Sequence, residues 1–196
     1  MTNYNVAILG ATGAVGQELI GLLRERNFPI KSLKLLASAR SAGRKVVIGK
    51  ESFVIEEATA ESFKDVDVAF FSAGGSISER FVDAAKSQGT VVIDNTSAFR
   101  LDKDVPLVVP EVNGDDLNWH KGLIANPNCS TIIAVMALAP LHARAKIKRM
   151  VVSTYQAVSG IGAAAIDDLD NQVQQYVSGE PMTAENFPSS SAERKY

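Results

Sequence analysis

A glycine-punctuated turn, GATGAVG at residues 10–16, is the feature that most constrains the fold. It follows the apolar run NVAIL and precedes a segment whose apolar residues, from Leu19 to Leu23, recur at helical spacing. A strand, a glycine turn and a helix in this order are typical of the first crossover of a parallel sheet. Glycine there lets backbone amides approach a pyrophosphate at the helix N-terminus, so the turn predicts a dinucleotide site. A plain tight turn is the alternative.

The same alternation continues along the chain. Strand-like runs at 32–38, 66–75 and 90–97 are joined by segments that include a helix-like one at 77–89. This order predicts an α/β fold with a doubly wound, Rossmann-like parallel sheet. The segment 44–58 alternates around Gly49 and predicts an added hairpin. Short apolar runs at 106–113 and 122–126 close this first unit.

The character of the chain changes at Cys129. An apolar helical segment runs to Pro140, with His142 in the polar end beyond it, and a β-rich run at 149–160 predicts a strand. A helix follows, stopped by Gly179 and carrying one apolar face. That face consists of Ile166, Leu169, Val173 and Tyr176. We therefore expect a dinucleotide-binding domain at 1–128 and, at 129–196, the start of a second, α+β domain that is incomplete, since one strand and one helix cannot bury their apolar faces alone.

Composition limits the classes of partner. The net charge is −2 and no long Lys/Arg run occurs, which argues against a nucleic-acid surface. The apolar start of the chain is too short for a signal peptide, and the longest apolar stretch is about half a membrane span. A single cysteine fits a reducing cytosol. We expect a cytoplasmic protein with no membrane partner and no bound metal.

The single cysteine lies in NPNCST, residues 126–131. Asn128 is a favoured helix cap, so Cys129 should occupy the first turn of the next helix. The helix dipole and free amides would stabilise a thiolate there, and the same amides could hold an oxyanion. The alternative is a small buried hydrophobe, which is the commoner role of a lone cysteine.

Basic and hydroxyl residues follow the second predicted strand, where an NAD site usually carries an acidic residue. Ser38, Arg40 and Ser41 stand there, with Arg44 and Lys45 close behind. These side chains favour a 2′-phosphate and therefore NADP. A basic solvated loop is the alternative.

Seven motifs together resemble the aspartate-semialdehyde dehydrogenases of the bacterial NADP-dependent type. They are GATGAVG, SARSAGRKV, FFSAGGS, DNTSAFR, VPEVN, NPNCST and TYQAVSG, and they cover essentially the whole chain. The resemblance implies reduction of L-aspartyl-4-phosphate to L-aspartate 4-semialdehyde through a cysteine thioester. It also implies that 129–196 begin the catalytic and dimerisation domain of the family. A place in lysine, threonine and methionine biosynthesis, and a homodimer when the enzyme is complete, follow from the same resemblance.

The resemblance also implies residue roles. Cys129 would be the nucleophile, Gln156 would orient the substrate, and Arg100 and Asn128 would bind substrate or phosphate. NADP would be held by Gly10, Thr12, Gly13, Ala14, Val15, Arg40, Ser41, Ser72, Gly74, Ser159 and Gly160. Simpler alternatives remain: an ion pair with a nearby Asp for Arg100, a satisfied polar residue for Gln156, and a plain turn at Ser72 and Gly74.

Two catalytic residues of this family, an acid/base histidine and a carboxylate-binding arginine, have no counterpart here. The histidines present are His120 and His142, which we expect at the surface. We therefore expect an N-terminal portion with weak or absent activity on its own. An N-acetyl-glutamyl-phosphate reductase and a non-catalytic dinucleotide-binding fragment are the competing interpretations.

Overall fold

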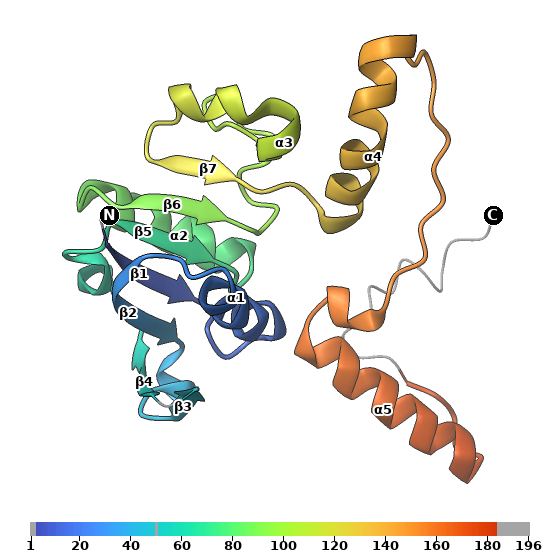
Figure 1. The fold of residues 1–196 in the computed structure, drawn as a ribbon. Coiled ribbons are helices and arrows are strands. Elements are labelled where there is room, and N and C mark those ends of the chain that lie inside the picture. Colours follow the sequence, from blue (N-terminus) through green and yellow to red (C-terminus); the bar gives the residue numbers. More distant parts are fainter. Residues whose placement is uncertain (1–2, 50, 184–196) are drawn as a thin grey trace. The chain divides into compact units, whose positions relative to one another are not determined.

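A computed structural model describes residues 3–49 and 51–183 of the chain. It divides into two compact units, Met1–Val152 and Ser153–Tyr196, each of which is described by itself. The first unit is built on a seven-stranded sheet flanked by helices (Figure 1).

The sheet has the order β3-β4-β2-β1-β5-β6-β7. Its strands are β1 (Tyr4–Leu9), β2 (Ile30–Ala37), β3 (Lys45–Ile48), β4 (Glu51–Glu57), β5 (Val68–Phe71), β6 (Val91–Asp94) and β7 (Leu123–Ala125). Neighbouring strands run parallel, except that β3 and β4 form an antiparallel hairpin at one edge. The predicted doubly wound sheet and its added hairpin are both confirmed.

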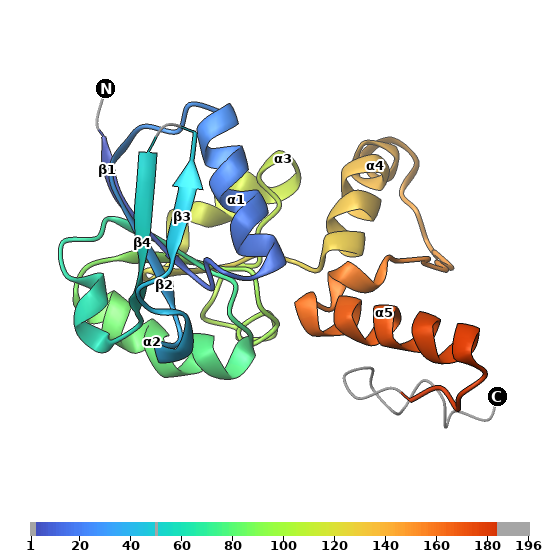
Figure 2. The same cartoon turned by 90° about the horizontal axis from the view of Figure 1, so that it is seen from below.

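The helices follow the predicted alternation. They are α1 (Ala14–Glu25), α2 (Gly75–Ser87), α3 (Pro110–Asn113), α4 (Cys129–Ala145) and α5 (Ala163–Ser178), with short 3-10 turns η1 (Ala39–Ser41), η2 (Ala60–Phe63), η3 (Gly114–Trp119) and η4 (Val158–Gly160). Helix α1 links β1 to β2, and α2 links β5 to β6. The two helices lie on opposite faces of the sheet (Figure 2).

Two cores result, because successive strand residues point to opposite faces. The core beside α2 contains Phe63, with ring centroids 5.5 Å from Phe71 and 6.1 Å from Phe81. The core beside α1 contains Ile8 and Ile20. Strand β1 contributes to both cores and is the most deeply covered strand.

The α1 side of the sheet is only partly covered over β5, β6 and β7. Burial alternates along these strands, so that the half-buried apolar residues Phe70, Ile93 and Ile124 each stand between two buried ones. Parallel sheets normally have both faces covered. This part of the sheet face therefore carries apolar surface in contact with solvent.

The prediction of a strand at 149–160 is wrong. Residues 146–157 form neither helix nor strand, and η4 follows them. A strand needs a neighbour for its backbone hydrogen bonds, and the described part of the second unit, 153–183, has none to offer. Helix α5 forms as predicted and ends at Gly179, whose φ is +72°. No helix in the described ranges is long and apolar enough to cross a membrane.

Candidate functional site

The glycine loop folds as a close-packed turn between β1 and α1. Gly10 has a φ of +96°, and a Cβ at this position would lie 2.8 Å from the Ser72 carbonyl carbon. A Cβ on Gly16 would lie 2.2 Å from the Gly10 oxygen. Gly13 occupies the N-cap position of α1, where no side chain caps the helix, and donates its N–H to the Gly10 oxygen at 3.0 Å. The backbone itself therefore requires glycine at Gly10 and Gly16. A plain tight turn meets the same requirement, so the dinucleotide site stays a prediction.

The N-terminus of α1 fits an anionic group. Gly13 offers no side chain to cap the helix, and no acidic residue stands in the first turn. Thr12 and Val15 are exposed beside it, and Ala14 is half-buried. The Gln17 side-chain amide donates to the Ala11 oxygen and fixes the loop. Uncapped amides at the positive end of a helix dipole suit the pyrophosphate of a dinucleotide.

Ser72 ties the end of β5 to the glycine turn. Its N–H and its Oγ both donate to the Leu9 oxygen, at 2.9 and 3.3 Å. Gly74 follows with a φ of +99° and open space around its Cβ position, so the backbone conformation alone explains that glycine. A cofactor contact at Ser72 or Gly74 stays a prediction.

The basic turn after β2 presents its arginine to solvent. Leu36 of β2 pairs with Leu9 of β1, so η1 begins close to the glycine turn. Arg40 is exposed there, whereas Ser41 is buried with 8% of its surface accessible. Arg40 is the better placed of the two to meet a phosphate.

Arg100 is held by two backbone carbonyls. Its Nε donates to the Asn126 oxygen and its Nη2 to the Asn95 oxygen, each at 2.9 Å. No carboxylate among residues 3–49 and 51–183 pairs with it, so the ion-pair alternative is wrong. The two backbone carbonyls orient the guanidinium, and its other N–H groups can donate to an external anion.

Cys129 is exposed in the first turn of α4, as predicted, and is not a buried hydrophobe. The Asn128 side-chain oxygen accepts from the N–H groups of Ser130 at 3.0 Å and Thr131 at 3.3 Å. The cap therefore uses these two amides. This corrects the expectation that the first-turn amides are free to hold an oxyanion.

The predicted site segments of the first unit follow neighbouring strands. The glycine loop follows β1, Ser72 follows β5, the turn carrying Arg100 follows β6, and Asn128 with Cys129 follows β7. These strands are parallel and adjacent, so the segments share one edge of the sheet (Figure 1). Open α/β sheets bind ligands at this carboxyl edge.

Comparison with known proteins decides the family. The family model of the semialdehyde dehydrogenase NAD-binding domain matches residues 5–120, and that of the dimerisation domain matches residues 138–193. The chain belongs to the semialdehyde dehydrogenase family. Its fold is the Rossmann-type domain of that family followed by the start of the dimerisation domain.

Three similar proteins bear on the function of this chain. The aspartate-semialdehyde dehydrogenase of Bacillus subtilis is 48% identical over 192 residues, which cover 98% of this chain and 56% of the relative. A crystal structure of aspartate semialdehyde dehydrogenase II complexed with ASA, from Vibrio cholerae, has a TM-score of 0.91 at 43% identity over 95% of this chain and 56% of that one. A Candida albicans aspartate semialdehyde dehydrogenase structure with NADP has a TM-score of 0.60 at 28% identity, over 73% and 48%. The chain thus spans about half the length of these relatives.

The remaining predicted site residues lie in the second unit. Gln156, Ser159 and Gly160 are exposed around η4, and their predicted roles stay predictions. His142 is exposed near the end of α4, as expected. His120 is half-buried, and its Nδ1 accepts the Gly122 N–H at 3.1 Å.

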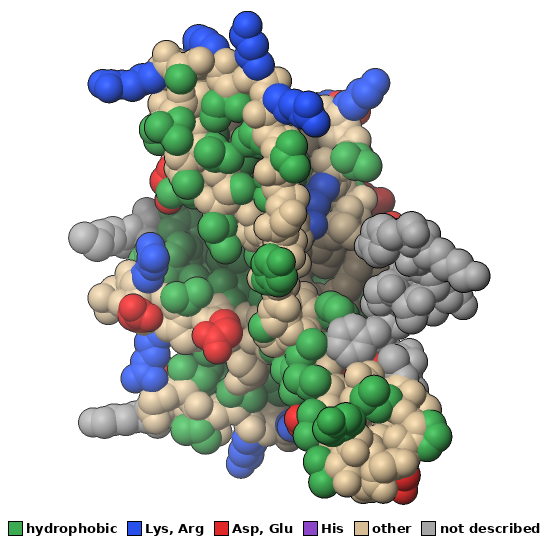
Figure 3. All heavy atoms as spheres, turned by 90° about the vertical axis from the view of Figure 1, so that its right-hand side faces the viewer, with side chains coloured by type: hydrophobic (Ala, Val, Ile, Leu, Met, Phe, Trp, Pro, Cys, Tyr) green, Lys and Arg blue, Asp and Glu red, His purple; other side chains and the backbone are tan. Residues whose placement is uncertain are grey.

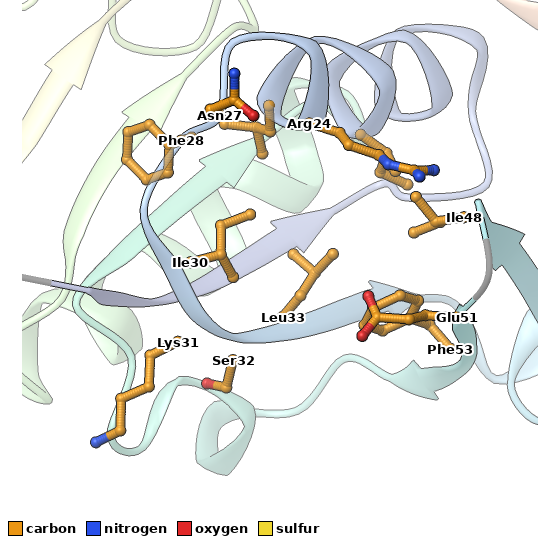
Figure 4. Close-up of a pocket in the computed structure, with 12 residues that line it drawn as sticks. Arg24, Asn27, Phe28, Ile30, Lys31, Ser32, Leu33, Ile48, Glu51 and Phe53 are labelled. Atoms are coloured by element: carbon orange, nitrogen blue, oxygen red, sulfur yellow. The ribbon is translucent and has the colours of Figure 1, made fainter.

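A pocket of about 370 Å³ lies away from this edge (Figure 4). It opens between the C-terminal half of α1, the start of β2 and the β3–β4 hairpin. Its charged side chains, Arg24, Lys31 and Glu51, are all exposed. Because β2 enters the sheet there, the pocket stands at the amino end of the strand and not at the ligand-binding edge.

Sequence reasoning missed a polar cluster at the site edge. Asp94, Asn95, Thr96 and Asn126 are linked by hydrogen bonds that also reach Arg100. All four lie in or beside the motifs DNTSAFR and NPNCST. One sequence feature could have predicted this cluster: an acidic residue, Asp94, ends an apolar strand. A carboxylate buried there needs hydrogen-bond donors close by.

Proposed function

We propose that this chain carries the cofactor domain and the nucleophile of an NADP-dependent aspartate-semialdehyde dehydrogenase. One arrangement carries the proposal: an exposed cysteine at the start of a capped helix, with an oriented arginine bonded to the preceding loop. The family membership, the 48% identity to the Bacillus subtilis enzyme and the Vibrio cholerae complex with ASA support the substrate. In this proposal the chain is cytoplasmic and acts in lysine, threonine and methionine biosynthesis.

The cofactor site would be formed by the first unit. The glycine loop and the uncapped start of α1 would hold the pyrophosphate, and exposed Arg40 would meet a 2′-phosphate. When bound, the nicotinamide supplies or accepts the hydride. The Candida albicans relative, whose structure was solved with NADP, supports this preference. Ser72 and Gly74, with Ser159 and Gly160 of the second unit, would complete the site.

Cys129 would form the covalent intermediate. Its thiolate sulfur attacks the acyl carbon of L-aspartyl-4-phosphate, the C–S bond forms, and the C–O bond to phosphate breaks to give a thioester and free phosphate. Reduction of the thioester, by a hydride that the bound nicotinamide would supply to the carbonyl carbon and a proton taken up by the oxygen, would yield a thiohemiacetal. Its C–S bond then breaks to give aspartate semialdehyde and the regenerated thiol. The exposed position in the first turn of α4 leaves the sulfur accessible to the acyl phosphate.

Arg100 would balance the charge of the departing phosphate. Its two backbone hydrogen bonds fix the guanidinium plane, and its remaining donors can bind phosphate oxygens. Gln156 would orient the acyl group. Asn128 would act through the start of α4, since its side-chain oxygen already accepts two amides.

Acylation of the single cysteine tests the proposal directly. The purified chain is mixed with L-aspartyl-4-phosphate without cofactor, and its intact mass is followed over time. We expect one aspartyl adduct, absent in Cys129→Ala and slowed in Arg100→Gln. The rival substrate, N-acetyl-glutamyl phosphate, should give no adduct at the same concentration.

Two results would contradict the proposal. Faster acylation by N-acetyl-glutamyl phosphate would assign the chain to the other reductase. Binding of NADP without acylation by either acyl phosphate would leave only a dinucleotide-binding module.

A further inference from the structure

A buried carboxylate stands at the end of β6, directly before the turn that carries Arg100. Asp94 has 0% of its surface exposed. Its Oδ1 accepts from Ser78 Oγ at 2.9 Å and from the Thr96 N–H at 3.0 Å, and its Oδ2 accepts from Thr96 Oγ1 at 2.8 Å. No Lys, Arg or His in the described ranges pairs with it. Such a group is unfavourable unless hydrogen bonds satisfy it, so its donors are held firmly in place.

Thr96 transmits this constraint into the turn. Its hydroxyl donates to Asp94 and at the same time accepts the Ala98 N–H at 3.2 Å. The carboxylate therefore fixes the backbone at two points of the turn, directly at Thr96 and through the hydroxyl at Ala98. This shapes the chain that leads to Arg100.

Arg100 then joins the turn to the loop before Cys129. Its two donors reach the carbonyl oxygens of Asn95 in the turn and Asn126 in the loop. The Asn126 side-chain amide donates to Asn95 Oδ1 at 2.7 Å, and the Asn126 N–H donates to the Asp94 carbonyl oxygen at 2.8 Å. Asn126 stands three residues before Cys129, at most about 11 Å along an extended chain.

We propose that Asp94, acting with Thr96, is a positioning residue that holds the anion-binding Arg100 in a fixed place beside the nucleophile. The inference rests on the proposed function, which makes Arg100 the phosphate-binding group. Asp94 itself is fully buried and contacts no substrate. Its effect reaches the site through Thr96 and the turn.

A second buried threonine provides a matched control. Thr90 precedes the opposite end of β6 and is 1% exposed. Its hydroxyl donates to the carbonyl oxygens of Val66 at 2.9 Å and Phe63 at 3.3 Å, in the core beside α2. Thr90→Val and Thr96→Val each remove a buried hydroxyl that flanks the same strand. They differ in whether that hydroxyl supports the turn of Arg100.

Alkylation of the single cysteine measures the position of the arginine. Iodoacetate is an anion and iodoacetamide is neutral, and both react with the thiolate, so the ratio of their rates cancels the thiolate fraction. A cationic Arg100 near Cys129 should raise the ratio on the order of threefold at low salt. Inorganic phosphate, as a competing anion, should abolish the increase.

We expect Arg100→Gln to lower the ratio to the value with saturating phosphate, and Thr96→Val to follow it at least halfway. Asp94→Asn should do the same where it folds, and Thr90→Val should keep the wild-type ratio despite a similar loss of melting temperature. If Thr90→Val and Thr96→Val lowered the ratio of the two alkylation rates equally, Asp94 would only stabilise the fold in general. That result would overturn the inference.

Two further outcomes separate the inference from the proposed function. If Arg100→Gln left the ratio of the two alkylation rates unchanged, Arg100 would form no anion subsite beside Cys129. Both the role proposed for Arg100 and this inference would then be wrong. A lowered ratio in Arg100→Gln, with Thr96→Val at the wild-type value, would keep the subsite and refute the role of Asp94 and Thr96 alone.

Discussion

Two glycines of α1 show how differently the same residue type contributes. Gly16 faces the glycine turn, where a Cβ would lie 2.2 Å from the Gly10 oxygen. Gly21 lies on the exposed side of the same helix, with nothing within 4 Å of its Cβ position. Glycine is thus required at Gly16 by backbone contact, whereas at Gly21 it only lowers helix propensity.

Alanine at these two positions should have opposite effects. Gly16→Ala must push α1 away from the turn, which should destabilise the first unit by about 1–3 kcal/mol or more and weaken NADP binding. Gly21→Ala should stabilise it by about 0.4–1 kcal/mol and leave NADP binding unchanged. Urea unfolding and NADP titration of the two variants measure both effects. Equal stability of the two variants would show that α1 does not pack on the turn as described.

Arg40 should set the preference for the 2′-phosphate. Removing a charge-assisted contact of about 1.5–3 kcal/mol, as in Arg40→Ala, should weaken NADP binding roughly ten- to a hundredfold and change NAD binding little. Lys31→Ala is the control, since Lys31 is an exposed cation near the other end of β2. Equilibrium titration with both dinucleotides gives the ratio of dissociation constants. Equal weakening of NADP and NAD would assign Arg40 to another part of the cofactor.

Residue patterns predicted the local geometry well and long-range partners poorly. The glycine turn and the cap at Asn128 follow from neighbouring residues and were confirmed. Arg100 contacts Asn126 across a sequence separation of 26 residues. This contact depends on β6 and β7 ending side by side, which no local pattern reveals. An ion pair with a nearby Asp was therefore a reasonable alternative that only the fold could remove.

At the scale of elements, α4 depends on its cap more than on burial. None of its 17 residues, all of which are described, is buried in this chain. The Asn128 side chain instead satisfies two first-turn amides. The position of Cys129 thus rests on a local device that the first unit forms by itself.

Asn128→Ala should therefore loosen the start of α4. We expect a loss of about 1 kcal/mol in helix stability and a changed alkylation rate of Cys129, because a frayed first turn no longer holds the thiol at the start of the helix. Asn171→Ala, an exposed interior position of α5, should leave that alkylation rate unchanged. The measurement is the iodoacetamide rate of each variant across pH. An unaltered profile in Asn128→Ala would mean that the cap does not control the thiol.

The segment between β6 and β7 carries an exposed ion pair, Lys121–Asp104, at 2.6 Å. Hydrogen bonding to Lys121 lowers the pKa of Asp104 below its ordinary 3.8, and the same bond raises the pKa of Lys121 above 10.5. The stabilisation that Asp104 contributes is therefore present above its pKa in the unfolded chain, and it is lost as the pH falls through its lower pKa in the folded protein. The stabilisation that Lys121 contributes is present below its pKa in the unfolded chain, and it is lost as the pH rises through its higher pKa in the folded protein.

Lys121→Met should make the stability of the first unit less dependent on pH near the aspartate pKa. The effect should be small, because both side chains are exposed, and added salt should remove it. Urea midpoints at acidic and neutral pH, at low and high salt, provide the test. A wild-type pH dependence in the variant would show that the pair does not form in solution.

Element prediction failed where a partner is needed. The run at 149–160 has strand composition, yet forms no strand, because no described neighbour completes its hydrogen bonds. Helix α5 needs no partner for its backbone bonds and forms as its periodicity predicts. Local pattern therefore suffices for helices and fails for strands at the edge of an unpaired region.

At the scale of the whole chain, apolar surface is unusually accessible. Ile133 of α4 is 73% exposed, and Tyr176 and Val177 of α5 are 74% and 80% exposed. Figure 3 shows hydrophobic side chains spread over the viewed surface, with several Lys and Arg side chains at its upper end and others along its left and lower edges. Exposed apolar surface of this extent marks interaction sites. The residues of α5 lie within the segment that matches the dimerisation domain, which supports the proposal that the protein assembles as a homodimer.

Self-association should therefore depend on α5. We expect the chain to sediment as a concentration-dependent mixture, and Tyr176→Lys with Val177→Lys to weaken association at least about tenfold, since two charges would have to be buried. Val47→Lys is the control, because Val47 is 71% exposed on the edge strand β3, outside the dimerisation match. Association that survives the α5 substitutions and is lost with Val47→Lys would place the contact on the sheet edge, where unpaired backbone groups recruit a second strand. Association that is lost with the α5 substitutions and kept with Val47→Lys would place the contact in the segment that matches the dimerisation domain, and not on the sheet.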